Sequence, residues 1–413
     1  MKAKKAEKAI NEAGYISELI GSIIRECPRR KAAGPDERRS QEMMRTELES
    51  LGLSTESRPF RFNDSLHANM ALHFGTAVLG TAVSGVFPAA GFALHSLAAG
   101  SYWADATRRG YVLRRLLGFR DGINLIATAP AAGPARRRVV IVAHADAGFT
   151  GWTFNPKMVK LVGPGHAGPS FMRHPISLAV KATAALAVLD AVRMAVGPLA
   201  LPLRPLEYAL TVPALMAFLF NMQILVHDEV VPGANDNLGS VAALPVLARR
   251  LLAWKPSDVE LVFVVSGMEE ASLGGADALA HQMEPVWDKD ATVVIAIDSI
   301  ANGELNYVRS EGEVAFGEIT PWLRDQLEAA ARDLPGFGEI KGFEPPVGGT
   351  DAWPFMVRGW TAAGLVCVDP ELGTPRHYHL PDDTLENLEM GSLIRSIDYL
   401  EALVKRLGKS AGD

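Results

Sequence analysis

Four residues that could do chemistry lie at or just after buried apolar runs of the sequence. His144 closes the run VVIVAH, Asp298 closes VVIAID, and Glu269 and Glu270 follow LVFVVSGM. Runs of this kind predict β-strands, and the carboxyl ends of parallel strands meet along one edge of an open sheet. We therefore expect these four side chains to lie close together although they are far apart in the sequence.

Two further candidates lie in loop-like strings rich in Gly, Pro, Asn and Asp. Asp236 belongs to PGANDNLG and His379 to HYHLPDDT. Singly, each candidate has an ordinary explanation, since a strand-end acid is commonly a cap or an ion-pair partner and a loop histidine is commonly a surface residue. Together, two histidines and three carboxylates suit a borderline divalent ion such as zinc. A shared carboxylate would bridge two such ions about 3.5 to 4 Å apart, as in two-metal hydrolases.

The elements that would position these residues alternate between strands and helices. Near-continuous β-branched runs are typical of parallel strands buried on both faces. The alternation from Asp228 onward indicates βαβ units, and we predict an α/β fold with a mixed, largely parallel central sheet flanked by helices. Strands are expected at 124–128, 139–144, 259–266, 291–298 and near GLVCV, and helices at 4–25, 37–52, after NDN, from about 274, at 320–333 and from Glu386 to about Lys405.

Two apolar segments interrupt this pattern and are expected to form helical hairpins. Residues 65–104 contain no Asp, Glu, Lys or Arg, and GVFP within them signals a turn. The second segment pairs 177–196 with the uncharged 208–227. The predicted catalytic domain thus comprises 1–64, 105–170 and 228–413, with hairpin insertions at 65–104 and 171–227.

Composition excludes several classes of protein. A formal charge of -6 offers no basic field for nucleic acid, and we expect no nucleic-acid partner. Two cysteines, Cys27 and Cys367, form neither a disulfide framework nor a CxxC metal site. The start of the sequence is charged and then amphipathic, unlike a secretory signal peptide.

The strings that carry the candidate residues resemble the motifs of a known family. In order, VVIVAHAD, PGANDNLGS, GMEEASLGG, IAIDS and YHLPDDTLENL are similar to the motifs of metallopeptidase family twenty-eight. That family includes zinc aminopeptidases, glutamate carboxypeptidase and glutaminyl cyclases. Carried over by position, the resemblance implies two zinc ions per chain, one bound by His144 and Asp298 and the other by Glu270 and His379, with Asp236 bridging.

The resemblance also suggests roles for three more carboxylates. Glu269 matches the family's general base, which moves a proton from the attacking water to the leaving amine. Asp146, two residues after His144, is expected to fix the imidazole tautomer, the alternative being a loop-capping aspartate. Asp351 in GGTDAWPF lies where relatives place a substrate-side or proton-relay group, but the family's Asp-His pair reads Asp-Ala here, and a structural role is an equal alternative.

These expectations indicate a dinuclear zinc hydrolase of peptide or amide bonds, foremost an aminopeptidase. A carboxypeptidase or an N-acyl amino acid amidohydrolase would use the same site, because the metal site does not choose which end of the substrate is held. The filled ligand set favours hydrolysis over cyclisation. It also disfavours a non-catalytic membrane scaffold, which has no need for an unliganded carboxylate beside buried ligands.

The hairpins distinguish this sequence from most relatives, in which a short loop joins the metal-binding histidine to the bridging aspartate. Residues 208–227 are long enough to span a bilayer, whereas 177–196 carries Lys181, Asp190 and Arg193, which are costly there. We expect membrane association with the catalytic domain in the cytoplasm, because Arg-rich 108–120 and the Lys-rich start lie on that side. The alternative is a soluble cytoplasmic enzyme whose apolar helices pack in a homo-oligomer.

Overall fold

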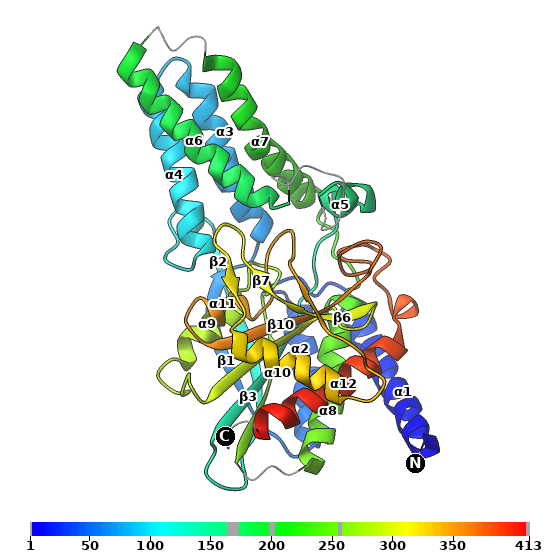
Figure 1. Ribbon diagram of the computed structural model, residues 1–413. Helices are drawn as coiled ribbons and strands as arrows, with labels where there is room; N and C mark the ends of the chain where they lie inside the picture. The colour runs from blue at the N-terminus through cyan, green and yellow to red at the C-terminus, as the bar shows by residue number, and fades with distance from the viewer. Residues whose placement is uncertain (1, 163–172, 198–202, 255–257, 410–413) are drawn as a thin grey trace.

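The structure, a computed structural model, describes residues 2–162, 173–197, 203–254 and 258–409. It consists of an α/β domain built on one large sheet and a bundle of four long helices that projects from it (Figure 1). The domain boundary expected at 170 falls within 163–172, outside the described residues.

The large sheet has eight strands in the order β1-β2-β4-β3-β5-β10-β6-β9, with β7 and β8 forming a separate hairpin. Strands β4, β3, β5 and β10 are parallel neighbours at its centre, and β1, β2 and β6 add antiparallel pairs. The predicted fold class, a mixed and largely parallel sheet flanked by helices, is confirmed. The strands are β1 Ser54–Asn63, β2 Phe119–Ala129, β3 Arg137–His144, β4 Val259–Ser266, β5 Thr292–Asp298, β6 Glu304–Val308, β7 Ser310–Glu311, β8 Gly317–Glu318, β9 Lys341–Phe343 and β10 Thr361–Val368.

Two details of the sheet differ from expectation. The run at 124–128 lies in β2, which is antiparallel to both of its neighbours, so its continuous apolar pattern reflects burial on both faces and not parallel pairing. Strand β1 was not predicted, because most of its side chains are exposed or half-buried and it lies at the sheet edge. Edge strands lack the continuous apolar run that identifies a buried strand.

Helices cover both faces of the sheet. Alternate residues of the central strands form two apolar clusters, one with α1, α2, α8, α10 and α12 and the other with α9 and α11. The last helix begins at Met390, later than the expected Glu386, because Leu385–Asn387 forms a separate 3-10 turn. The helices are α1 Lys2–Glu26, α2 Pro35–Ser50, α8 Ser240–Trp254, α9 Gly274–Met283, α10 Pro321–Asp333, α11 Trp353–Met356 and α12 Met390–Lys409.

The two apolar segments fold as hairpins that together make the bundle. The first is α3 (Leu66–Ser84) and α4 (Pro88–Ala106), and the second is α6 (Pro175–Val196) and α7 (Arg204–His227). The Ser65 hydroxyl caps α3 by accepting the Ala68 N–H, and Pro88 and Pro175 lie at helix starts, where no backbone donor is needed. Figure 1 shows the four helices side by side and projecting away from the sheet.

Contacts at the foot of the bundle join it to the α/β domain. The Tyr102 hydroxyl of α4 donates to Glu313, between β7 and β8, at 2.7 Å. The Trp152 N–H donates to Gln223 of α7 at 2.9 Å, from the short helix η2 (Trp152–Phe154). Val314 packs against the apolar core of the bundle. We call this set of contacts the joint.

Candidate active site

The residues predicted at strand ends meet at one edge of the sheet. His144 is the last residue of β3 and pairs in register with Ser266, the last residue of β4. Asp298 is the last residue of β5, and Glu269 and Glu270 follow β4. Because these three strands are parallel neighbours, their carboxyl ends bring the four side chains together as expected.

The other two predicted residues reach the same edge from loops. Asp236 lies in the irregular turn η5 (Ala234–Gly239) that leads into α8, and its peptide bond to Asn237 is cis. His379 lies in the loop after β10 and has a left-handed backbone with φ of 54°. Asp383 ties these loops together, because its carboxylate accepts the N–H groups of Asn235 at 2.8 Å and Asp236 at 3.0 Å.

The ligand atoms form two groups that share one carboxylate. One group is His144, Asp236 and Asp298, and the other is Asp236, Glu270 and His379, with the atoms of each within 4.8 Å of one another. Asp236 Oδ1 lies 3.3 Å from His144 Nε2, and Asp236 Oδ2 lies 3.4 Å from His379 Nε2. The two oxygens of a single side chain thus face two different imidazoles.

The donor atoms fit divalent cations. His144 Nδ1 donates to the Asp146 main-chain carbonyl at 3.1 Å, so in the neutral imidazole Nε2 is the atom that could bind a metal ion, and it faces the carboxylates. His144 Nε2 and Glu270 Oε1 are buried and have no hydrogen-bond partner, although buried polar atoms are normally satisfied. Each group offers one imidazole nitrogen and two carboxylates, a set of donors that suits zinc.

The site concentrates negative charge in a buried place. Burial opposes protonation of His144, yet Glu269 and the other carboxylates around it raise its pKa well above the usual value. Burial likewise opposes ionisation of Asp236, but the imidazoles of His144 and His379, which face its carboxylate, lower its pKa. Buried carboxylates cluster in this way only where cations compensate them, and bound metal ions would supply that charge.

Glu269 belongs to neither ligand group. Its Oε2 lies 3.9 Å from His144 Nε2, and its side chain is 11% exposed. Burial, and after it the carboxylates of Glu270 and Asp351, raise the pKa of Glu269 well above its usual range. The Asp298 side chain is 18% exposed, so the site is open to molecules from solvent.

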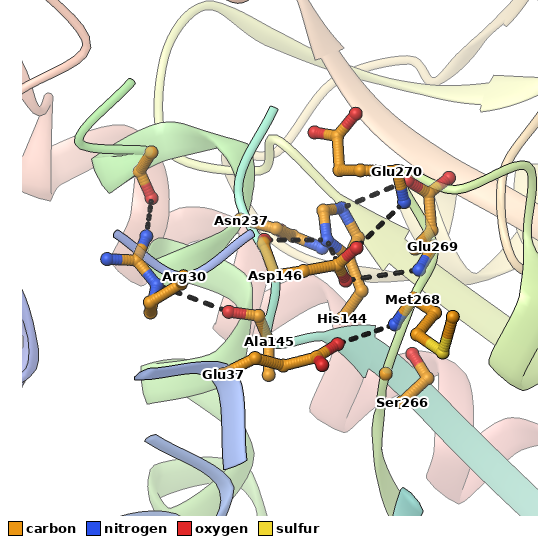
Figure 2. Close-up of polar contacts among 12 residues, drawn as sticks. Arg30, Glu37, His144, Ala145, Asp146, Asn237, Ser266, Met268, Glu269 and Glu270 are labelled. Carbon is orange, nitrogen blue, oxygen red and sulfur yellow. Dashed lines mark hydrogen bonds and ion pairs between the residues drawn. The ribbon is translucent and has the colours of Figure 1, made fainter. Parts of the chain in front are cut away.

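Asp146 contacts more than the imidazole for which it was predicted. Its carboxylate lies 3.6 Å from His144 Nδ1, farther than the main-chain carbonyl of the same residue. The two carboxylate oxygens accept the N–H groups of Glu269 at 3.1 Å and Glu270 at 2.9 Å. Asp146 therefore positions the loop that carries both glutamates, as Figure 2 shows.

Two buried charged residues near the site were not identified from the sequence. Arg30 is fully buried and donates to the carbonyls of Ala145 and Pro232, which precede Asp146 and Asp236 in their loops. Glu37 accepts the Met268 N–H at 2.6 Å (Figure 2). No local signal distinguishes either residue, because both lie in the charged stretch PRRKAAGPDERRS.

Asp351 lies beside the predicted site in a buried position. One carboxylate oxygen accepts the Ser266 hydroxyl at 2.5 Å, and the other has no hydrogen-bond partner. Burial raises the pKa of Asp351 to about 7. The oxygen without a partner fits a group that contacts substrate. The bond to Ser266 fits a structural group, so both predicted roles agree with this position.

Solved structures share this fold. The chain matches a glutaminyl cyclase from an Acidobacteriales bacterium with a TM-score of 0.56 and 15% identity, over 97% of this chain and 95% of that one. It matches BSAP, a zinc aminopeptidase from Bacillus subtilis, with a TM-score of 0.55 and 14% identity, over 95% and 94%. At this level of identity the likeness shows the fold, that of zinc aminopeptidases and glutaminyl cyclases.

Sequence comparison finds relatives for the second half of the chain. Residues 222–404 match peptidase family M28. Aminopeptidase YwaD of Bacillus subtilis (strain 168) is 29% identical over 178 residues, which are 42% of this chain and 37% of that protein. These matches agree with the resemblance that the motifs predicted, and they support a zinc metallopeptidase.

Proposed function

We propose that this chain is a dinuclear zinc hydrolase that removes amino-terminal residues from peptides. The observation that carries the proposal is the shared carboxylate of Asp236, whose two oxygens face His144 and His379 at 3.3 and 3.4 Å. When bound, two zinc ions would polarise the scissile carbonyl and lower the pKa of water. His144 and Asp298 would hold one ion, Glu270 and His379 the other, and Asp236 both.

Glu269 is proposed as the general base. It is adjacent to Glu270 in the sequence but outside both ligand groups, so its carboxylate is free to exchange protons. Its Oε2 would accept a proton from the attacking water and deliver it to the nitrogen of the leaving amine. Asp146 fixes the main chain at Glu269 and Glu270 and so sets where that carboxylate lies.

The test is to compare Glu269→Gln with the wild type and with Glu318→Gln, a change at an exposed position in β8. Losing a general base costs roughly 10²- to 10⁴-fold in kcat. We expect Glu269→Gln to lose activity on that scale while retaining wild-type zinc content, and Glu318→Gln to match the wild type. Full activity in Glu269→Gln would contradict its role as the base.

A substrate panel decides which end of the substrate is held. Aminoacyl, N-acyl and carboxyl-terminal amide substrates distinguish an aminopeptidase from an amidohydrolase or a carboxypeptidase acting at the same site. A peptide with amino-terminal glutamine belongs in the panel, because glutaminyl cyclases share the fold. Cleavage of free-amine substrates alone supports the aminopeptidase, and cyclisation in place of hydrolysis contradicts it.

We also propose that the bundle holds the enzyme in a membrane. Among the described residues, α6 and α7 are long and apolar enough to cross one, and only 22% of the apolar window of α7 is buried. The core helix of a soluble protein would be mostly buried. The large apolar and aromatic side chains that α7 exposes are Leu206, Tyr208, Val212, Leu215, Met216, Leu219, Met222, Leu225 and Val226.

The interior of the bundle contains an apolar cluster and, beside it, buried charged side chains. Arg193 of α6 donates to Glu207 of α7 at 2.7 Å, and His95 of α4 pairs with Asp190 of α6 at 2.7 Å, all four side chains being buried. A soluble bundle places apolar residues inside and polar ones outside. Polar groups that face one another beneath an apolar exterior are typical of helices in lipid.

The helices also have the length that a bilayer requires. They contain 19 to 24 residues, and α3 and α4 carry no Asp, Glu, Lys or Arg before Asp105. At 1.5 Å per residue this is about 29 to 36 Å, against a hydrocarbon core of about 30 Å. We expect the full-length protein to stay in membranes through alkaline washing. A monodisperse protein obtained without detergent would contradict this and would indicate that the apolar faces pair in an oligomer.

A further inference from the structure

The foot of the bundle lies against the candidate active site. Asn221 of α7 and His67 of α3 are hydrogen-bonded at 2.8 Å, and the His67 ring meets the Phe149 ring edge-on with centroids 5.9 Å apart. The main-chain carbonyl of Phe149 lies 3.2 Å from His379 Nδ1. A single stretch of chain therefore separates the ends of two bundle helices from a proposed zinc ligand.

That stretch carries aromatic side chains toward the site. The Phe154 ring lies 4.3 Å from the His379 ring and 5.8 Å from the Tyr378 ring, measured between centroids. Trp152, two residues before Phe154, is 63% exposed. On the side facing the bundle, the metal site thus adjoins apolar surface, which suits an apolar portion of a substrate.

A mixed apolar and basic surface lies at the same end of the bundle, at the end of α4 and in the segment that follows it. Trp103 and Val112 are exposed, and the Arg109 guanidinium stacks over the Trp103 ring at 4.8 Å. Arg115 and Leu116 are exposed in the 3-10 turn η1 (Leu113–Leu116) that follows. We call these five residues the collar. Tryptophan and arginine at the end of a membrane helix are typical of the interface with anionic headgroups.

We propose that the collar binds anionic phospholipid and holds the zinc site at the membrane surface, where the enzyme acts on peptides anchored in the same membrane. The inference rests on the proposed function and names its substrate class. The bond to be cleaved would lie at headgroup level, with the apolar part of the substrate beside Phe154 and Tyr378 and its anchor in the bilayer. Confinement to one surface raises the effective concentration of such a substrate.

The test uses the full-length protein in phosphatidylcholine vesicles prepared with and without phosphatidylglycerol. Two peptides with the same free amino terminus are compared, one soluble and one with a palmitoyl group on a carboxyl-terminal lysine. We expect kcat/KM to be at least roughly tenfold higher for the anchored peptide. With phosphatidylglycerol present, the double change Arg109→Glu, Arg115→Glu should reduce that advantage severalfold and leave hydrolysis of the soluble peptide unchanged.

The double change Arg324→Glu, Arg332→Glu on α10 is the matched control, since it reverses two exposed arginines on the α/β domain away from the collar. Equal kcat/KM for both peptides in the wild type overturns the proposed substrate class and leaves the hydrolase standing. If the control variant loses as much of the advantage for the anchored peptide as the collar variant does, the proposed role of the collar is wrong. Cleavage of neither peptide by a zinc-loaded wild type counts against the proposed function itself.

Discussion

At the scale of single residues, the candidate site depends on buried charged groups that hold main-chain segments. Asp146 accepts two N–H groups at Glu269 and Glu270, Asp383 accepts two near Asp236, and Arg30 donates to carbonyls in two loops. Hydrogen bonds to charged groups are stronger than neutral ones and are costly to leave unmade once buried. The position of the ligands therefore depends on residues that bind no metal themselves.

Replacing Asp146 by asparagine tests this positioning role. The amide has one oxygen to accept one of the two N–H groups, and its NH₂ group would face the other donor. Loss of a partner that orients ligands lowers metal affinity roughly 10- to 100-fold. We expect that loss in zinc titrations, with a parallel fall in kcat. Asp121→Asn, at a side chain that is 77% exposed, should change neither quantity.

Replacing Arg30 by methionine tests the link between the two loops. Four carbonyl contacts would be lost, to Cys27, Ala145, Pro232 and Gly233. Buried carbonyls without partners should lower the free energy of unfolding by about 3 kcal/mol, measured by denaturant titration in detergent solution. The neighbouring Arg29→Met removes exposed contacts with Asp228, an ion pair and a hydrogen bond to its carbonyl, for which about 0 to 1 kcal/mol is expected. Equal losses for both changes would contradict the role of Arg30.

The proposed metal ligands could be named from the sequence because each lies in a recognisable string. Arg30 and Glu37 could not, since their contacts form only when the chain folds. Arg30 reaches Ala145 across 115 positions, and Glu37 reaches Met268 across 231. A charged residue in a charged loop looks like a solvated one until its distant partners are known.

At the scale of elements, the central strands were predictable because burial on both faces leaves a continuous apolar run, as in β3 and β4. The edge strand β1 has a mostly exposed pattern and gave no such run. The direction of β2 in the sheet could not be predicted from its apolar run, because burial depends on the neighbouring layers and not on the direction of pairing. The hairpins could be predicted from their apolar segments. The ion pairs inside the bundle could not, because they form only when the four helices pack.

The buried ion pairs of the bundle lead to a prediction about its stability. Arg193 contacts Glu207 at 2.7 Å and Asp190 at 3.7 Å, and all three side chains are buried. Arg193→Met would remove the nearest cation of buried Glu207 and one of the two partners of Asp190, a change that costs about 3 to 5 kcal/mol. We expect a clear drop in the temperature of thermal unfolding in detergent. Val192→Ala, at a neighbouring side chain that is 41% exposed, should have little effect, and equal drops would indicate general loosening of α6.

At the scale of the whole molecule, each hairpin returns the chain to the side from which it left. In the proposed membrane arrangement, the tip of the first hairpin, at Val86, would therefore lie across the membrane from the α/β domain. The native Cys27 and Cys367 are free and buried, so they contribute little background to thiol labelling. This permits a direct measurement of topology.

We expect an impermeant maleimide to label Val86→Cys on intact cells and Ser50→Cys, at the end of α2, only after lysis. The reason is the excess of Arg and Lys on the side of the α/β domain. If Ser50→Cys alone were labelled on intact cells, the α/β domain would lie outside the cell, opposite to the expected orientation. Equal labelling of both positions on intact cells or in membrane-free extracts would show that the first hairpin does not cross a bilayer.

The joint has a consequence for the products of the enzyme. Tyr102–Glu313 and Gln223–Trp152 join the α/β domain to the foot of the bundle, so in the proposed membrane arrangement the fold would set the height of the proposed zinc site above the lipid. An exopeptidase held at a fixed height shortens an anchored peptide one residue at a time until the remaining stub no longer reaches. The bundle would then act as a ruler, and the length of the stub would record the distance between the metal ions and the membrane.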